Sequence, residues 1–82
     1  MVKLYALSTC PWCKKVKLLL EEKGVNYQGV DVDKLTGAEQ EQAVAEVERL
    51  TGSRNFPVTL IGGMVIKGYQ PEKISEALQN EK

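Results

Sequence analysis

The chain contains no histidine and only two cysteines, Cys10 and Cys13. The lack of histidine excludes Ser-His-Asp and Cys-His catalysis, because both use an imidazole as the general base. It also excludes every zinc site that needs a histidine ligand. Two cysteines are too few for the disulfide framework of a small secreted protein. The chemistry that remains open to this sequence is concentrated in the cysteine pair.

Long apolar runs and an excess of charge of one sign are also missing. No apolar run approaches the roughly 20 residues that cross a bilayer. Residues 1–7 lack the apolar segment and the small-residue cleavage site of a secretory signal. The 11 basic and 11 acidic side chains cancel, which argues against binding to nucleic acid. We therefore expect no membrane and no nucleic-acid partner, and a cytoplasmic location.

The length of 82 residues predicts a single small domain over residues 1–82. A hydrophobic content of 43% is enough to build one core. Local patterns predict seven elements in the order β-α-β-α-β-β-α. This order predicts an α/β fold with helices between the first three strands and a closing antiparallel hairpin. The expected strands are residues 3–7, 25–33, 58–61 and 64–67, and the expected helices are residues 11–23, the segment between Thr36 and Gly52, and a last helix from Pro71.

Glycine and proline mark the ends of these elements. Pro11 suits the first position of a helix, and Gly24 suits the residue that ends it. Gly29 falls where the alternation of the second strand slips, which predicts a β-bulge. Thr36 and Glu39 match a capping box at the start of the second helix. The apolar residues expected to face the sheet from the first helix are Val16, Leu18, Leu19 and Leu20.

The two cysteines are three positions apart, where the first strand gives way to the first helix. A helix N-terminus offers free N–H groups and partial positive charge, and both stabilise a thiolate at Cys10. Lys14 and Lys15 add positive charge and are expected to lower the pKa of Cys10 further. Cys13, one turn inside the helix, is expected to be the shielded thiol. The predicted chemistry is thiol–disulfide exchange, in which Cys10 attacks a substrate disulfide and Cys13 resolves the mixed disulfide.

Two other interpretations of the cysteine pair stay open. The pair could be half of a zinc site completed by carboxylates or by another chain, because a tetrahedral site needs two further ligands. It could also be two inert core cysteines. A Cys-x-x-Cys motif in a βαβ pattern favours redox chemistry over both.

The motif at residues 9–13, Thr-Cys-Pro-Trp-Cys, resembles the active site of the glutaredoxins, which reads Cys-Pro-aromatic-Cys. Phe56, Pro57 and Val58 are similar to the second signature of that family, and the segment 61–63 is similar to its hairpin. The resemblance covers about residues 2–79. It implies a thioredoxin fold with a four-stranded mixed sheet and flanking helices.

The resemblance also implies roles for particular residues. Pro57 would form a cis peptide bond and lie against the cysteine pair, and the backbone of Phe56 would pair with the substrate cysteine. Pro11 and Trp12 would belong to the same surface that binds the substrate thiol. An aromatic Trp12 in place of the family's usual Tyr keeps an apolar face for a peptide or protein partner.

Two positions differ from the glutathione-using pattern. Leu7 stands where many glutaredoxins carry a cation that helps hold the glutathione carboxylate, and Arg54 or Lys67 would be the substitutes. The segment 68–71, which begins with Gly68 and Tyr69, reads Gly-aromatic-x-Pro. It resembles the redoxins that donate electrons to ribonucleotide reductase and are recharged by thioredoxin reductase.

The main prediction is therefore a dithiol, glutaredoxin-like oxidoreductase that acts on protein disulfides, in electron transport and cell redox homeostasis. No cofactor is bound permanently and no metal is expected; glutathione or another small thiol would be a cosubstrate at most. The reductant would be glutathione or thioredoxin reductase, and the chain is expected to act as a monomer. The alternatives are the thioredoxin-reductase-dependent donor, an iron–sulfur-cluster-binding glutaredoxin that pairs two subunits, and a redox-inactive adaptor.

Overall fold

The computed structural model of the protein describes residues 2–81. The order of helices and strands is β-α-β-α-β-β-α, as predicted, with one short 3₁₀ turn, η1, before the second helix. The elements are β1 (Val2–Ala6), α1 (Pro11–Glu22), β2 (Gln28–Asp31), η1 (Val32–Lys34), α2 (Gly37–Thr51), β3 (Val58–Ile61), β4 (Met64–Lys67) and α3 (Pro71–Glu81).

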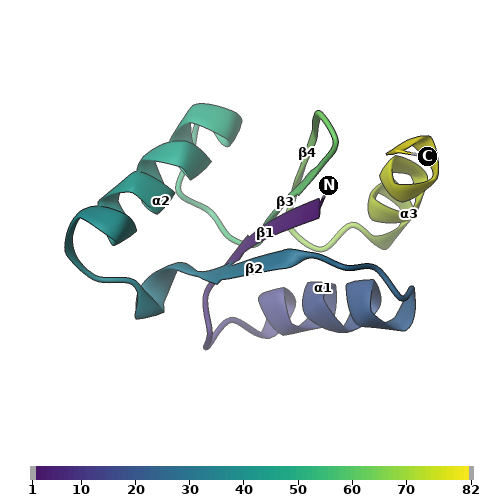
Figure 1. The fold of residues 1–82 in the computed structure, drawn as a ribbon, viewed down its shortest axis with the longest axis horizontal. Coiled ribbons are helices and arrows are strands. Elements are labelled where there is room, and N and C mark those ends of the chain that lie inside the picture. Colours follow the sequence, from purple (N-terminus) through teal and green to yellow (C-terminus); the bar gives the residue numbers. More distant parts are fainter. Residues whose placement is uncertain (1, 82) are drawn as a thin grey trace.

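The four strands form one mixed sheet in the order β2-β1-β3-β4. β1 and β2 run parallel because α1 carries the chain back between them, whereas β3 is antiparallel to both β1 and β4. Figure 1 shows α2 on one side of the sheet and α1 and α3 on the other. The predicted mixed sheet with flanking helices is therefore confirmed.

Each face of the sheet has its own apolar cluster, since successive residues of a strand point to opposite faces. Cys13, Val16 and Leu20 of α1 and Ile74 and Ala77 of α3 pack on one face, against β1, β3 and β4 residues that include Leu4 and Ile61. The opposite face is covered by α2. The buried residues of this second cluster are Tyr5, Val32, Ala43, Val47 and Val58.

The first helix begins and ends as its sequence predicts. Pro11 occupies its first turn, where no N–H is needed. Gly24 follows the helix with a φ of +66°, and the Val25 N–H donates to the Leu20 carbonyl at 3.1 Å. This closing pattern uses a left-handed residue that glycine adopts without strain. No helix within residues 2–81 is both long and apolar enough to cross a membrane.

Three local predictions need correction. Leu18 faces solvent with 57% of its surface exposed, because Val16 and Leu20 already fill the side of α1 that meets the sheet. Gly29 makes no bulge: it pairs in unbroken register, and β2 starts only after Tyr27, whose side chain packs against the α1-side cluster. Thr36 is the N-cap of α2, but its side chain makes no capping hydrogen bond.

Candidate active site

The two cysteines lie where β1 gives way to α1. Cys10 is the N-cap residue of α1, in an extended backbone conformation, and its N–H donates to the Leu7 carbonyl at 3.2 Å. Cys10 is half-buried, whereas Cys13 is fully buried one turn into the helix. Both thiols are free. The sequence thus places one sulfur near the surface and a second directly behind it.

The surroundings of Cys10 favour its thiolate. Partial burial alone would raise the pKa of the Cys10 thiol. Hydrogen bonds from the Cys13 side chain and from the N–H groups of Cys13 and Trp12 outweigh this effect and lower that pKa below its ordinary value. The first turn of a helix supplies these donors because its N–H groups have no partner within the helix.

The surroundings of Cys13 favour its neutral thiol. Burial raises the pKa of Cys13 to about 11, and the neighbouring Cys10 adds to the rise. The Leu7 N–H, which lies 3.4 Å from the Cys13 sulfur, and the charge of Lys17 act in the opposite direction. The two sulfurs therefore differ in acidity because one accepts hydrogen bonds at a helix end and the other is enclosed by the core.

A shallow groove of about 300 Å³ is lined by Trp12, the residue directly before Cys13 in the chain. The groove brings together three separate segments of the chain. The Phe56–Pro57 peptide is cis, as the resemblance implied, and the Gly68 N–H donates to the Pro57 carbonyl at 2.8 Å. The predicted site residues that line the groove are Trp12, Phe56, Pro57, Gly68 and Tyr69.

The role of Lys14 and Lys15 in lowering the pKa of Cys10 stays a prediction. Both side chains are exposed, and neither is among the groups that shift the pKa of Cys10. Lys15 instead lies over the Trp12 ring, 4.4 Å from its centroid, and 5.9 Å from the centroid of Tyr69. The two aromatic rings are themselves 6.0 Å apart. A cation held over aromatic faces in this way organises the rim of the groove.

Sequence reasoning missed the ion pair behind Cys13. Lys17 lies one turn after Cys13, and its ammonium group donates to Asp31 of β2 at 2.8 Å, with both side chains half-buried. The carboxylate raises the pKa of Lys17 and keeps it charged. The spacing of four residues on a helix was a usable signal for Lys17. The pairing with Asp31 depends on the parallel register of β1 and β2, which no local pattern reveals.

A second missed contact holds the loop before Cys10. Asp33 accepts hydrogen bonds from the N–H of Ser8 at 2.9 Å and from its hydroxyl at 2.5 Å. These bonds lower the pKa of the Asp33 carboxyl below its ordinary value. They connect η1 to the loop between β1 and α1, and so restrain the segment that leads to Cys10.

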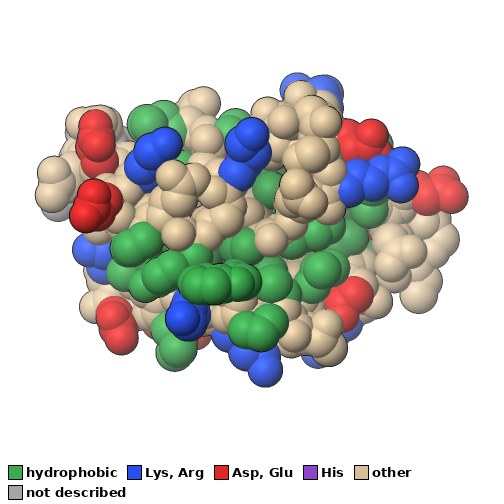
Figure 2. Space-filling model, turned by 180° about the vertical axis from the view of Figure 1, so that it is seen from behind, with side chains coloured by type: hydrophobic (Ala, Val, Ile, Leu, Met, Phe, Trp, Pro, Cys, Tyr) green, Lys and Arg blue, Asp and Glu red, His purple; other side chains and the backbone are tan. Residues whose placement is uncertain are grey.

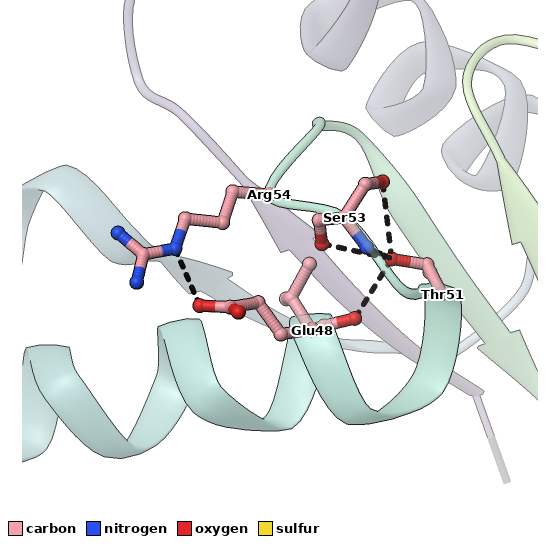
Figure 3. Close-up of polar contacts among 5 residues, drawn as sticks. Glu48, Thr51, Ser53 and Arg54 are labelled. Carbon is pink, nitrogen blue, oxygen red and sulfur yellow. Dashed lines mark hydrogen bonds and ion pairs between the residues drawn. The ribbon is translucent and has the colours of Figure 1, made fainter.

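Of the two cations predicted to substitute at the Leu7 position, Arg54 is engaged elsewhere, whereas Lys67 is exposed at the end of β4, next to Gly68 of the groove. Leu7 is partly buried against the α2-side cluster. Arg54 forms an ion pair with Glu48 of α2, and Thr51 and Ser53 close the turn between them (Figure 3). Arg54 is thus held on α2. Across residues 2–81, no three acidic or cysteine side chains are grouped closely enough to hold a metal ion.

Comparison with known proteins identifies the family. The family model described as Glutaredoxin matches residues 2–66. The chain is 32% identical over 79 residues to an uncharacterised glutaredoxin-like 8.6 kDa protein in the rubredoxin operon of Clostridium pasteurianum, covering 96% of this chain and 99% of that protein. It is 34% identical over 65 residues to Glutaredoxin 1 of Rickettsia conorii, of which it spans 61%.

Solved structures agree. The glutaredoxin of Archaeoglobus fulgidus superposes with a TM-score of 0.91 at 36% identity, covering 95% of this chain and 85% of that one. The glutaredoxin of Methanosarcina mazei superposes with a TM-score of 0.88 at 47% identity, and the match covers 94% of this chain and 76% of that one. The glutaredoxin-like NrdH-redoxin of Escherichia coli superposes with a TM-score of 0.74 at 27% identity, and the match covers 92% of this chain and 91% of that one. That protein is described as having a thioredoxin-like activity profile. Because the family model covers well over half of the chain, this protein belongs to the glutaredoxin family and has its thioredoxin fold.

Proposed function

We propose that this protein is a dithiol oxidoreductase that reduces disulfide bonds of proteins through Cys10 and Cys13. The observation that supports this most is the opposite acidity of the two thiols at the start of α1. Cys10 has a lowered pKa and reaches the surface, while burial raises the pKa of Cys13 to about 11. A thiolate is the attacking species in disulfide exchange, so the two sulfurs take separate roles.

The first step is attack by the Cys10 thiolate on one sulfur of a substrate disulfide. A sulfur–sulfur bond forms between Cys10 and that sulfur, and the bond inside the substrate breaks. The other substrate sulfur leaves as a thiolate and takes a proton from solvent. Hydrogen bonds from the N–H groups of Trp12 and Cys13 stabilise the attacking thiolate before the step.

The second step releases the substrate. Cys13 loses its proton and attacks the Cys10 sulfur, which forms the internal disulfide and expels the second substrate thiolate. The substrate has then gained two electrons and the protein has lost two. Two electrons from an external thiol or reductase return Cys10 and Cys13 to the free thiols.

The groove beside the cysteines is the proposed position of the substrate chain. Trp12 and Tyr69 offer aromatic faces, and Phe56 and Pro57 line the same groove. As the resemblance implies, the backbone at Phe56 would pair with the reacting substrate cysteine. The protein needs no permanent cofactor for this chemistry, and its reducing dithiol suits the cytoplasm.

A trapping experiment tests the proposal. A Cys13→Ser variant, mixed with an oxidised protein substrate, is expected to accumulate a mixed disulfide on Cys10 that mass spectrometry detects. A Cys10→Ser variant is expected to form no such adduct and to reduce no disulfide. Disulfide reduction by Cys10→Ser at the wild-type rate would overturn the proposal, as would two cysteines that never pair under mild oxidation.

A second candidate is a donor recharged by thioredoxin reductase rather than by glutathione. Two observations favour it: Leu7 supplies no cation for a glutathione carboxylate, and Arg54 is held by Glu48. The similarity to the NrdH-redoxin of Escherichia coli, with its thioredoxin-like profile, points the same way. NADPH consumption separates the two. Turnover only with glutathione and its reductase would identify a glutathione-dependent oxidoreductase. Turnover only with thioredoxin reductase would identify an electron donor that is recharged by that enzyme.

A further inference from the structure

A second hollow continues the active-site groove along the first helix. It has a volume of about 240 Å³ and lies beside the middle of α1. Tyr69 lines both hollows. The Lys15 ammonium group lies over the ring of Tyr69 and over the ring of Trp12, which lines the active-site groove. The residues that line the second hollow are Lys15, Leu18, Leu19, Glu22 and Tyr69.

The surface between the hollows is apolar and open. Trp12 and Leu18 are 54% and 57% exposed, and within residues 2–81 they are two of the three large hydrophobic residues that face solvent. Figure 2 shows hydrophobic side chains gathered in a band across one face, with both basic and acidic side chains around it. Leu18 adds nothing to the core, so its exposed side chain is unexplained by folding.

The charges of α1 run against the preference of a helix. Basic residues follow its first turn, at Lys14 and Lys15, while Glu21 and Glu22 stand in its last turn. The helix dipole favours the opposite arrangement. The second hollow therefore has a cation at the end near Cys10 and a carboxylate at the far end.

We propose that the second hollow binds one apolar side chain of a protein substrate, about four residues away from the substrate's reacting cysteine. The proposal rests on the proposed function, because the mixed disulfide on Cys10 is what fixes the substrate chain at this surface. Leu18 follows Cys10 by eight positions, which is roughly 12 Å along a helix. An extended chain covers that distance in about four residues.

The partner is therefore a polypeptide segment with a defined pattern. It carries the reacting cysteine, then an acidic residue near Lys15, then a leucine-like side chain, and a basic residue near Glu22. Glutathione is too short to fill both hollows, since only one residue flanks its cysteine on each side. The second hollow thus selects protein disulfides over small ones.

Synthetic peptides test this directly. Each peptide carries one cysteine linked to thionitrobenzoate and a leucine or a serine four positions away. In one set of peptides that residue precedes the cysteine, and in the other set it follows the cysteine. Attack by Cys10 on the peptide sulfur releases the coloured thiol and joins the peptide to Cys10, from which Cys13 then releases it. We expect the leucine peptide to react five- to tenfold faster than its serine partner in one direction, the gain from burying about half of a leucine side chain.

The ratio of the two rates is the readout, so any general effect of a variant on Cys10 cancels. Leu18→Ser is expected to bring the ratio close to one. Met64→Ser is the matched control, because Met64 is also exposed but lies in the β3–β4 hairpin outside both hollows. A second pair of leucine peptides carries a lysine or a glutamate beyond the leucine, and Glu22→Lys is expected to abolish the preference for the lysine peptide.

The outcomes are distinct. A ratio near one for the wild-type protein in both directions, or an unchanged ratio in Leu18→Ser, overturns the docking proposal. If the wild-type protein also fails to react with a small aromatic disulfide, the proposed function itself has failed. Reaction with the small disulfide but no leucine preference leaves the oxidoreductase and removes only the docking site.

Discussion

Removal of the Lys17 charge is expected to slow the second step of the reaction while leaving the first step unchanged. Lys17 lies one turn from Cys13 and lowers the pKa of that thiol, whereas it is not among the groups that act on Cys10. In Lys17→Gln the positive charge is lost and the Asp31 carboxylate is left without its partner. Loss of the Lys17 charge raises the pKa of Cys13.

The size of the effect follows from charge and distance. Residues four apart on a helix have Cβ atoms roughly 6 Å apart, and a unit charge at about that distance, with an effective dielectric constant of about 20, changes the free energy of a thiolate by about 3 kcal/mol. Asp31 already offsets part of the Lys17 charge, and solvent reaches both side chains, which reduces this energy to about 1 kcal/mol. A thiolate of higher pKa is less populated but more nucleophilic, so the resolving step should slow by about twofold to fourfold at neutral pH.

A coloured aromatic disulfide separates the two steps. Cys10 releases the first coloured thiol when it attacks the reagent, and Cys13 releases the second when it resolves the mixed disulfide. Stopped-flow traces should show a first phase of unchanged rate and a slower second phase in Lys17→Gln. Lys23→Gln is the matched control, because Lys23 is exposed and follows the end of the same helix. Equal second phases in the two variants would refute the reasoning.

Three further predictions concern stability. Leu4→Ala, at a fully buried position, should lower the free energy of unfolding by about 2–5 kcal/mol in urea titrations. Gly24→Ala should cost about 1–2 kcal/mol in the same assay, because φ is +66° and an alanine there is strained although nothing lies within 4 Å of its Cβ. The pKa of the Asp33 carboxyl is lower in the folded protein than in the unfolded chain, so its ionised form stabilises the fold at pH values above the unfolded-state pKa. This stabilisation is lost as the pH falls through the pKa of the folded state. Below about pH 4 the melting temperature should therefore depend less on pH in Asp33→Asn than in the wild-type protein. An unchanged slope of melting temperature against pH would contradict the role of the hydrogen bonds from Ser8.

The sequence predicted the order of elements and the ends of α1 because these depend on local chemistry. Pro11 and Gly24 each have a conformational preference that needs no tertiary contact. The groove is different, since it joins Trp12, Phe56 and Tyr69 from three segments. Its residues were named through the resemblance to a family, and residue spacing alone would not have brought them together.

The errors have a common physical cause. Leu18 was assigned to the core because a leucine run gives no clear helical face, and only the position of the sheet decides which leucines are covered. Gly29 was assigned to a bulge because the alternation was counted from Tyr27, which lies before β2. Each error concerns a side-chain direction that tertiary packing sets.

The cysteine pair itself orders the two steps of the proposed reaction. In the reduced protein the Cys13 thiol donates to the Cys10 thiolate, and Cys10 contributes to the high pKa of Cys13, together with burial. When Cys10 joins a mixed disulfide, its negative charge and its acceptor role disappear. The Leu7 N–H and the Lys17 charge remain, and both favour the Cys13 thiolate. Cys13 therefore becomes more acidic when a substrate is attached, so the thiol that would compete with Cys10 in the free protein becomes the nucleophile that releases the product.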